Sequence, residues 1–530
     1  MRFLLSLFLL ITTPLMAKAS EGWQEVLTNK PLTIMPELIR STWEKRVPSE
    51  SEPSAYDKIC LQRLIMQGNS TPKAVVFFLP GTWSSGEQLF SDDFASSVLA
   101  SLQKRRPLEP ERKPLFDSLE KELQTFLDRS APHIFAKAGY DVYAIDYRTH
   151  FVDQSLSLNQ VGFMRSWGWP MFISDTKEAI EKAKELSGFR KVFLAGESFG
   201  GMLAMTYASE YWDKGLSGII LLDGGNGGQW KMRIQIPSNA LRGVDIVDNR
   251  FTPEAIQGLI DLAGRQLIYQ SGSYAMDNAN ENGAMSEITP LLIHALNSMG
   301  IPIMSVSIPH YPQVSKDMTN DPLAPPKDPV TGKFLQPYDP KTKKPFSSYL
   351  EWASEVLNED LWPNLFTNLA GGENTRLGLG YIAATFDRYW PLEVYLESVK
   401  MYKLEITTNK EPYGIPSSSV IQTMKDVPKP NADIFLKEET QPIPHYEKNF
   451  KNINVPLIRF ASRLGLLLWG SDDPGIASKD YTNGGEYPFL GHLDTYIGTH
   501  NDELINGPAL DWLNRHTKAP KSDLLVRSLL

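Results

Sequence analysis

The chain has 530 residues, of which 42% are hydrophobic and 11% are aromatic. This composition is sufficient for a sizeable core and excludes a chain that is disordered throughout. The formal net charge is −9 and no basic patch stands out in the sequence, which argues against nucleic acid as a partner.

The first nineteen residues have the pattern of a secretory signal. Arg2 precedes the apolar run Phe3–Ile11, which is too short to span a bilayer, and Ala17-Lys18-Ala19 supplies a small-x-small cleavage site. No later run approaches eighteen apolar residues, so we expect no integral membrane segment after residues 1–19 are removed. The pattern therefore predicts an exported protein, periplasmic or secreted.

Cys60 is the single cysteine, so an intramolecular disulfide is excluded. Its apolar neighbours Ile59 and Leu61 favour a buried thiol in a strand over a nucleophile. An exported chain without disulfides fits a bacterial source better than a eukaryotic secretory route.

The first part of the core, residues 20–228, shows strands that alternate with helices. Residues 20–55 are polar and contain prolines, which favours a surface arm. The predicted strands are Ile59–Gln67, Lys73–Leu79, Asp141–Tyr147, Lys191–Ala195 and Gly218–Leu222. The predicted helices lie within residues 87–138 and at Met171–Ser187 and Gly201–Ser209. This alternation predicts an α/β fold with a mostly parallel sheet and helices on both of its faces.

Residues 229–450 break this alternation and predict a large, mainly helical cap inserted into the core. Its helical candidates are Pro253–Gln270, Ser347–Leu369 and Tyr381–Lys403, which are apolar or rich in aromatic residues. The core resumes in residues 451–530, with strands expected at Leu457–Ala461 and Gly465–Trp469 and a closing helix at Gly507–Arg515.

The sequence Gly196-Glu197-Ser198-Phe199-Gly200 follows a predicted strand and precedes a predicted helix. A strand that turns directly into a helix places the serine on a tight, strained corner with its hydroxyl clear of the sheet. Glycines are expected two residues on either side, because a Cβ there would collide with the adjacent helix and strand. This context predicts that Ser198 is a nucleophile.

These features together resemble the α/β-hydrolase superfamily. The features are the loop that begins at Pro80-Gly81, the serine motif, the helical insertion, and the late segment Gly491-His492-Leu493-Asp494. That segment, with Gly498 after it, also resembles the C-terminal histidine motif of acid lipases. The resemblance covers residues 57–228 and 451–516 and implies a lipase-like or esterase-like serine hydrolase.

A serine hydroxyl needs a histidine base within hydrogen-bond reach before it can attack a carbonyl carbon. Among the eight histidines, His492 alone lies in a loop after the last predicted strand, as the superfamily order of serine, acid and histidine requires. His500 and His516 are alternatives, but both fall in or near the closing helix and are expected at the surface.

The carboxylate that orients the histidine is less clearly marked. The superfamily usually carries it after the strand Leu457–Ala461, where this chain has Ser462-Arg463-Leu464. Asp223 follows the neighbouring strand and is favoured by a small margin over Asp472 and Asp473, which follow Gly465–Trp469. Two further aspartates carry less weight. They are Asp480, a more distant candidate, and Asp494, which is expected to brace the His492 loop.

The tetrahedral oxyanion needs two backbone N–H donors. Phe199, directly after the nucleophile, should supply one, and Thr82, or next Trp83, should supply the other from the loop after Lys73–Leu79. Family members often have His-Gly in this loop, whereas this chain has Pro80-Gly81. The glycine is kept, but the contacts that brace the loop through the histidine are lost.

The aromatic insertion favours carboxylic esters with an apolar acyl group, including lipids, as substrates. A peptidase that releases short peptides is the alternative on the same fold, since the motif does not separate ester from amide. A binding protein that has lost activity is the third reading, supported by the missing acid at Ser462–Leu464. No H-E-x-x-H motif, Cys/His cluster or G-x-G-x-x-G after a strand is present, so no metal or organic cofactor is expected.

Overall fold

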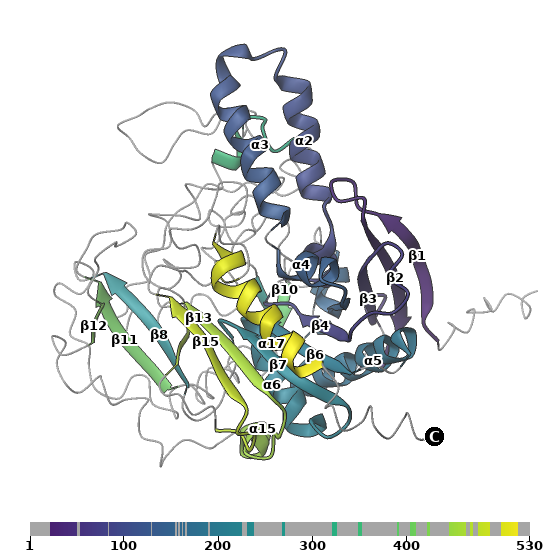
Figure 1. Cartoon of the computed structure of the whole chain (residues 1–530), viewed down its shortest axis with the longest axis vertical. Helices are drawn as coiled ribbons and strands as arrows, with labels where there is room; N and C mark the ends of the chain where they lie inside the picture. Colours follow the sequence, from purple (N-terminus) through teal and green to yellow (C-terminus); the bar gives the residue numbers. More distant parts are fainter. Residues whose placement is uncertain are drawn as a thin grey trace, which may run out of the picture.

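A computed structural model describes the chain in a central α/β body and in parts of the insertion (Figure 1). The described residues are 22–49, 54–82, 84–128, 130–153, 156, 160–161, 163–164, 167–188, 191–224, 230–237, 268–270, 321–325, 348–351, 389–391, 403–409, 421–423, 445–462, 467–469, 475–487, 495 and 500–517.

The body is built on one sheet that, within the described residues, has nine strands. In order across the sheet they are β1 (Gln24–Pro31), β2 (Leu38–Arg46), β3 (Lys58–Met66), β5 (Asp141–Asp146), β4 (Val75–Leu79), β6 (Val192–Glu197), β7 (Leu216–Leu222), β13 (Leu457–Ser462) and β15 (Tyr481–Tyr487). The six strands from β5 to β15 are parallel to one another, and β3, β2 and β1 extend the sheet from β5 through successive antiparallel pairings. The predicted mostly parallel sheet is therefore confirmed.

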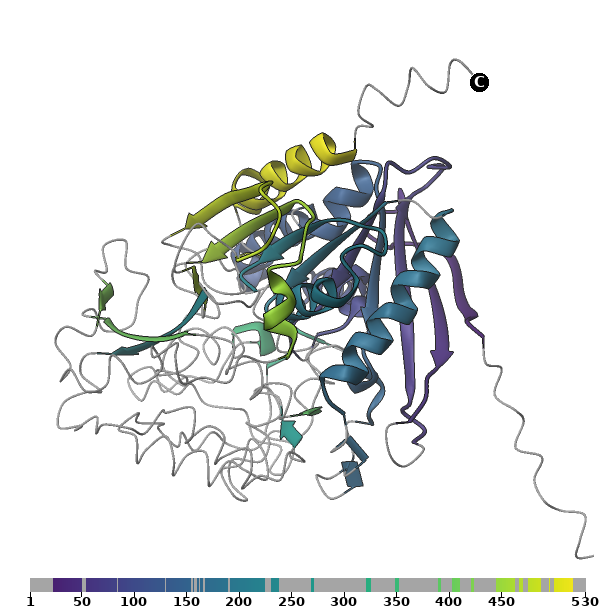
Figure 2. The same ribbon diagram turned by 90° about the horizontal axis from the view of Figure 1, so that it is seen from below.

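The middle strands are apolar on both faces because helices cover both faces. All five residues of β4, from Val75 to Leu79, are buried. One face packs against α1 (Gly86–Phe90), α2 (Asp93–Arg105), α3 (Lys113–Asp128), α4 (Ala131–Lys137) and α17 (Gly507–Thr517). The other face packs against α5 (Trp169–Ser187), α6 (Phe199–Tyr211) and α15 (His445–Phe450). Figure 2 shows α17 and α5 on opposite sides of the sheet.

Short helical turns complete the body at η1 (Pro110–Arg112), η2 (Arg148–Phe151) and η7 (Asp502–Asn506). The helices predicted within residues 87–138 are confirmed, and α2 and α3 project from the body as a hairpin (Figure 1). Cys60 is buried in β3, as expected, and burial raises the pKa of its thiol far above the ordinary value. No helix in the described part of the chain has the length and apolar character needed to cross a membrane.

The prediction of a surface arm for residues 20–55 is wrong. β2 pairs with β3 over nine residues, from Leu38 opposite Met66 to Arg46 opposite Lys58, and β1 adds an exposed edge strand. The mixed, polar composition of this segment does not indicate strands, because its strand character comes from pairing with the neighbouring strands β2 and β3 and not from the segment's own sequence.

The strand predicted at Gly465–Trp469 exists in part but does not belong to the central sheet. It is β14 (Leu467–Trp469), which pairs antiparallel with β8 (Trp230–Pro237). The core strand after β13 is β15 instead, which runs parallel to β13 at the edge of the sheet. Its polar sequence, Tyr-Thr-Asn-Gly-Gly-Glu-Tyr, reflects that partly exposed position.

Most of the predicted cap, residues 229–450, lies outside the described residues, including Ser347 and residues 352–369 of one expected helix. The described stretches of the cap include strands. Among the described residues, β8, β11 (Lys403–Asn409) and β12 (Ile421–Thr423) of the cap form a four-stranded sheet with β14, which follows the cap in sequence. β9 (Ile268–Gln270) pairs with β10 (Tyr389–Pro391), so the helices expected to include these residues are wrong at both positions. The reason is a pairing between segments about 120 residues apart, which helical periodicity cannot reveal.

Candidate active site

Ser198 sits on the turn between β6 and α6 with φ 52° and ψ −120°. This positive φ is uncommon for a residue with a side chain and is characteristic of a strained turn. The carbonyl of Ser198 accepts hydrogen bonds from the N–H groups of Gly201 (3.0 Å) and Met202 (3.3 Å), which begin the helix. The strand-to-helix turn predicted from the sequence is therefore present, with Ser198 half-buried at its corner.

The two glycines of the motif are required by close packing, as predicted. A Cβ on Gly196 would lie 2.2 Å from the carbonyl oxygen of Gly200. A Cβ on Gly200 would lie 1.8 Å from the carbonyl oxygen of Leu79 and 2.8 Å from that of Pro80. Because these obstacles are backbone atoms, a side chain cannot be accommodated by a rotamer change. The turn therefore packs directly on the end of β4.

The loop after β4 runs beside the serine. A Cβ on Gly81 would lie 2.3 Å from Oε2 of Glu197 and 3.2 Å from Cβ of Ser198, so the Gly81 backbone borders both residues. Thr82, the next residue, is half-buried. On the other side of the serine, Phe199 begins α6 at the positive end of the helix dipole, and its ring is buried. Ser198 thus lies between the two segments predicted to carry the oxyanion donors.

Asp223 directly follows β7, the strand next to β6 in the sheet. The N–H of Ser198 donates to the carbonyl of Leu222 (3.2 Å), and the N–H of Asp223 donates to the carbonyl of Phe460 (2.9 Å). Asp223 is fully buried with φ 41°, and a Cβ on Gly224 would lie 2.4 Å from the carbonyl oxygen of Ser198. The turn after β7 therefore packs directly against the backbone of the serine turn.

The comparisons with known proteins agree with this geometry. The profile of the family described as "Serine aminopeptidase, S33" matches residues 128–335. A candidate lipase from Sulfolobus solfataricus superposes with a TM-score of 0.51 and 22% identity, over 93% of this chain and 99% of its own. The protein has an α/β-hydrolase fold. At that identity the structural likeness supports the fold alone.

Two further findings complete these comparisons. A carboxyl esterase from Bacillus coagulans, described as highly thermostable, is 13% identical over 94% of this chain and 99% of its own. Its TM-score is 0.33. A search of curated proteins found no match to this sequence.

The remaining predicted residues of the hydrolase site fall outside the described residues. They are His492, Asp494, Asp472, Asp473 and Trp83. The structure describes the strand that leads toward His492, because β15 ends at Tyr487 in the central sheet. Asp472 and Asp473 were expected to follow a core strand at Gly465–Trp469, whereas the described residues of that segment belong to another sheet.

The alternative histidine His516 is held away from Ser198. Its Nε2 lies 2.8 Å from a carboxylate oxygen of Asp480, and its Nδ1 lies 2.8 Å from the carbonyl oxygen of Trp512. The backbone carbonyl of Asp480 accepts the N–H of Leu457, the first residue of β13, so this pair lies at the amino ends of the parallel strands. Ser198 lies at their carboxyl ends. Asp480 and His516 therefore form a pair at the opposite end of the parallel strands from Ser198, and neither is a candidate for the catalytic site. His500, the other alternative, is exposed.

A network of polar side chains, which the sequence analysis missed, supports the start of α1. Asp146 accepts the N–H of Glu87 and a side-chain N–H of Gln62, both at 2.6 Å, and Gln62 accepts the hydroxyl of Thr42 at 2.6 Å. Burial raises the pKa of Asp146 to about 6. Nε2 of His150 lies 3.2 Å from the Glu87 carboxylate, and this contact lowers the pKa of Glu87. Strands were predicted at β3 and β5, but the sequence did not indicate that they would bury polar side chains.

The described residues also bear on metal binding. In this part of the chain, no group of three His, Cys, Asp or Glu side chains comes together in a way that could hold a metal ion.

Proposed function

We propose that this α/β-hydrolase cleaves carboxylic esters with Ser198 as the nucleophile. The observation that carries the proposal is the strained Ser198 at φ 52°, bordered by the Gly81 loop on one side and the Asp223 turn on the other. To attack a carbonyl carbon, a serine hydroxyl must be presented on such a turn, with hydrogen-bond donors close by. The acyl group is transferred to the Ser198 oxygen, and water then releases it as the acid.

His492 is the proposed base, and Asp223 is the proposed acid that orients it. The histidine would take the serine proton and return it to the leaving alcohol. The position of β15 in the sheet supports His492, since the loop after this strand begins at the same edge as Ser198. Asp223 is supported by full burial beside the serine turn and by the different sheet to which β14 belongs.

The oxyanion would be held by the backbone N–H groups of Phe199 and Thr82. Phe199 is the first residue of α6, where the helix dipole favours negative charge. Thr82 follows Gly81, whose backbone approaches Ser198 closely. Loss of one such donor lowers kcat by about 10²–10³-fold in serine hydrolases. We also propose export of the mature protein, for which the signal pattern in residues 1–19 is the support.

A peptidase is the second candidate, because the matching family is described as a serine aminopeptidase. The two activities share every proposed step except the leaving group, which is an amine instead of an alcohol. Hydrolysis of p-nitrophenyl esters and of aminoacyl anilides by one preparation distinguishes them.

The test of the main proposal compares wild-type protein with Ser198→Ala on p-nitrophenyl esters of increasing acyl length. We expect hydrolysis by the wild type and loss of turnover in the variant at an unchanged melting temperature. Retained turnover in Ser198→Ala would refute the proposal. Cleavage of anilides without cleavage of esters would select the peptidase.

A further inference from the structure

The loop that precedes Thr82 lacks the histidine that often braces it in the superfamily. A buried side chain next to the neighbouring strand instead donates a hydrogen bond to the backbone of this loop. The hydroxyl of Tyr147 donates to the carbonyl oxygen of Pro80 at 3.1 Å, and both groups are buried. Tyr147 directly follows β5, which pairs with β4 in the sheet. The bond therefore joins the carboxyl ends of two adjacent strands.

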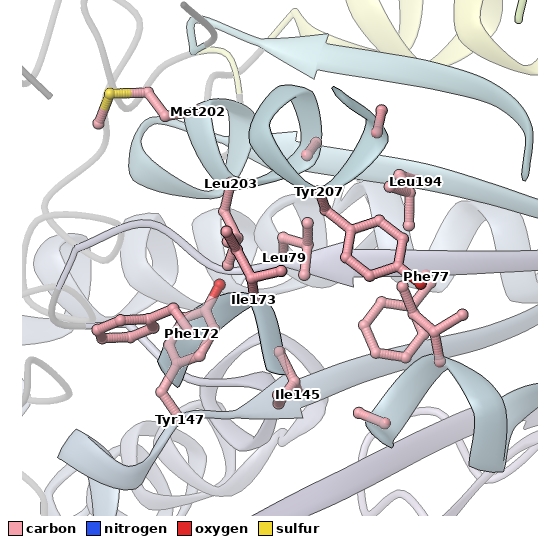
Figure 3. Packing of buried hydrophobic residues seen from close by; sticks show 14 of the residues in the cluster. Phe77, Leu79, Ile145, Tyr147, Phe172, Ile173, Leu194, Met202, Leu203 and Tyr207 are labelled. Atoms are coloured by element: carbon pink, nitrogen blue, oxygen red, sulfur yellow. The ribbon is translucent and has the colours of Figure 1, made fainter. Parts of the chain in front are cut away.

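The tyrosine ring is held firmly, so the position of its hydroxyl is fixed. Tyr147 is 1% exposed and packs edge-on against Phe172, with ring centroids 5.3 Å apart, and against Phe199, at 6.0 Å. Figure 3 shows Tyr147 beside Phe172 in the core cluster beneath α6. The same packing that holds Tyr147 thus involves Phe199, the residue after the nucleophile.

The Pro80 carbonyl is also confined from the side of the serine motif. A Cβ on Gly200 would lie 2.8 Å from this oxygen, so the carbonyl borders the first turn of α6. Gly81 in turn borders the Glu197 carboxylate. Burial and the negative charge of Glu197 raise the pKa of Tyr147 well above its ordinary value, which keeps the hydroxyl protonated as a donor.

We propose that Tyr147 is a positioning residue that orients the oxyanion loop of this hydrolase through the Pro80 carbonyl. The Pro80 carbonyl belongs to the peptide plane that joins Pro80 to Gly81, and the Thr82 N–H belongs to the next plane. Fixing the first plane leaves only the two torsions of Gly81 to set the direction of the Thr82 N–H. Because glycine restricts these torsions least, the loop depends on an external brace. This inference rests on the proposed function.

The kinetic test removes the hydroxyl in Tyr147→Phe and uses Tyr143→Phe as a matched control. Tyr143 lies within β5, the strand that Tyr147 directly follows; it is fully buried and packs in the same core cluster. Its hydroxyl donates to the Asp141 carboxylate at 3.1 Å, at the opposite end of β5. Both variants lose one buried hydroxyl, so a merely structural effect should be similar in the two.

We expect Tyr147→Phe to lower kcat for p-nitrophenyl butyrate by about 10-fold to 100-fold. A misplaced oxyanion donor should cost somewhat less than the complete loss of that donor. KM should stay within about twofold, because the oxyanion forms only after substrate binding. Tyr143→Phe should change neither constant by more than about twofold. An unchanged kcat in Tyr147→Phe, or an equal loss in both variants, would overturn the proposal.

A second measurement separates this proposal from the proposed function. Amide hydrogen exchange is followed on peptides that cover residues 79–86 in the wild type and both variants. Faster exchange at Gly81 and Thr82 in Tyr147→Phe, but not in Tyr143→Phe, would support the brace even if no ester were hydrolysed. Equal exchange in all three proteins would overturn it, whatever the activity of the wild type.

Discussion

The packing of the serine turn on β4 makes a sharp prediction for Gly200→Ala. The new methyl carbon would lie 1.8 Å from the Leu79 carbonyl oxygen, whereas real Cβ contacts are essentially never shorter than 3.0 Å. α6 and β4 would therefore have to separate by about 1.2 Å, and neither can yield by rotating a side chain. Overpacking of this kind costs about 3 kcal/mol or more, at the upper end of the usual range.

The assay for Gly200→Ala is differential scanning calorimetry together with turnover of p-nitrophenyl butyrate. For a chain of 530 residues, an unfolding entropy of about 2.1 cal/mol/K per residue converts 3 kcal/mol into a fall in Tm of about 3 °C. Turnover should also fall at least about 100-fold, because the displaced helix carries the N–H of Phe199.

Gly168→Ala is the control for this prediction. Its Cβ would meet only Cδ of Pro170, at 3.8 Å, so the expected change is below about 1 kcal/mol, from the altered helix cap of α5. If Gly200→Ala melted with the control and kept wild-type turnover, the close packing of the serine turn against β4 would be wrong, and so would the geometry derived from it.

Three other substitutions test separate parts of the account. Gly81→Ala should lower kcat and cost about 1 kcal/mol of stability, because the new Cβ would meet the side-chain oxygen of Glu197. Adding Glu197→Ala should restore the lost stability. Equal melting of the single and double variants would contradict this. Asp146→Asn should gain stability relative to the wild type as the pH rises from about 4 through about 6, by up to about 3 kcal/mol, and keep that gain at higher pH, as measured by calorimetry. Burial raises the pKa of Asp146, so the contribution of this carboxyl is present below pH 4 and lost as pH rises through about 6; a difference that does not change with pH would refute it. Arg148→Met should lower the unfolding free energy by about 3–5 kcal/mol in urea titrations. The buried carboxylates of Asp175, 2.7 Å from Arg148, and Asp57 would both lose their partner. An unchanged midpoint would exclude that role.

The central strands and the serine turn were predictable because their signals are local. β4 and β6 contain short apolar runs, one followed by Pro80-Gly81 and the other by Gly196. The Gly-x-Ser-x-Gly spacing defines a turn whose crowding depends on neighbouring residues. The requirement for glycine at 196 and 200 therefore followed from the sequence. Asp223 could be placed after the neighbouring strand for the same reason, though the sequence alone did not separate it from Asp472 and Asp473.

The strands at the sheet edges were not predictable, because their pairing partners, and not their own sequences, make them strands. β15 carries polar residues and two glycines, and only its pairing with β13 makes it a strand. β14 has the apolar sequence of a core strand but pairs with β8, more than 200 residues earlier in the chain. An apolar triplet does not specify which sheet it joins, and this ambiguity produced the alternative acids.

Tyr147 shows a further limit of prediction from sequence. The loss of a histidine before Gly81 was visible, but the replacement contact comes from a strand that is 67 residues away in sequence and adjacent in the sheet. A tyrosine at the end of a buried strand is ordinarily a core residue. Only the direction of its hydroxyl, toward the Pro80 carbonyl, distinguishes it.

The most direct test of the central claim is tandem mass spectrometry of the wild-type protein after reaction with a fluorophosphonate. This reagent forms a stable bond with a serine only where a base and an oxyanion site activate the hydroxyl. The account predicts a single adduct on Ser198, abolished in His492→Ala. Absence of an adduct, or an adduct on another serine, would contradict it.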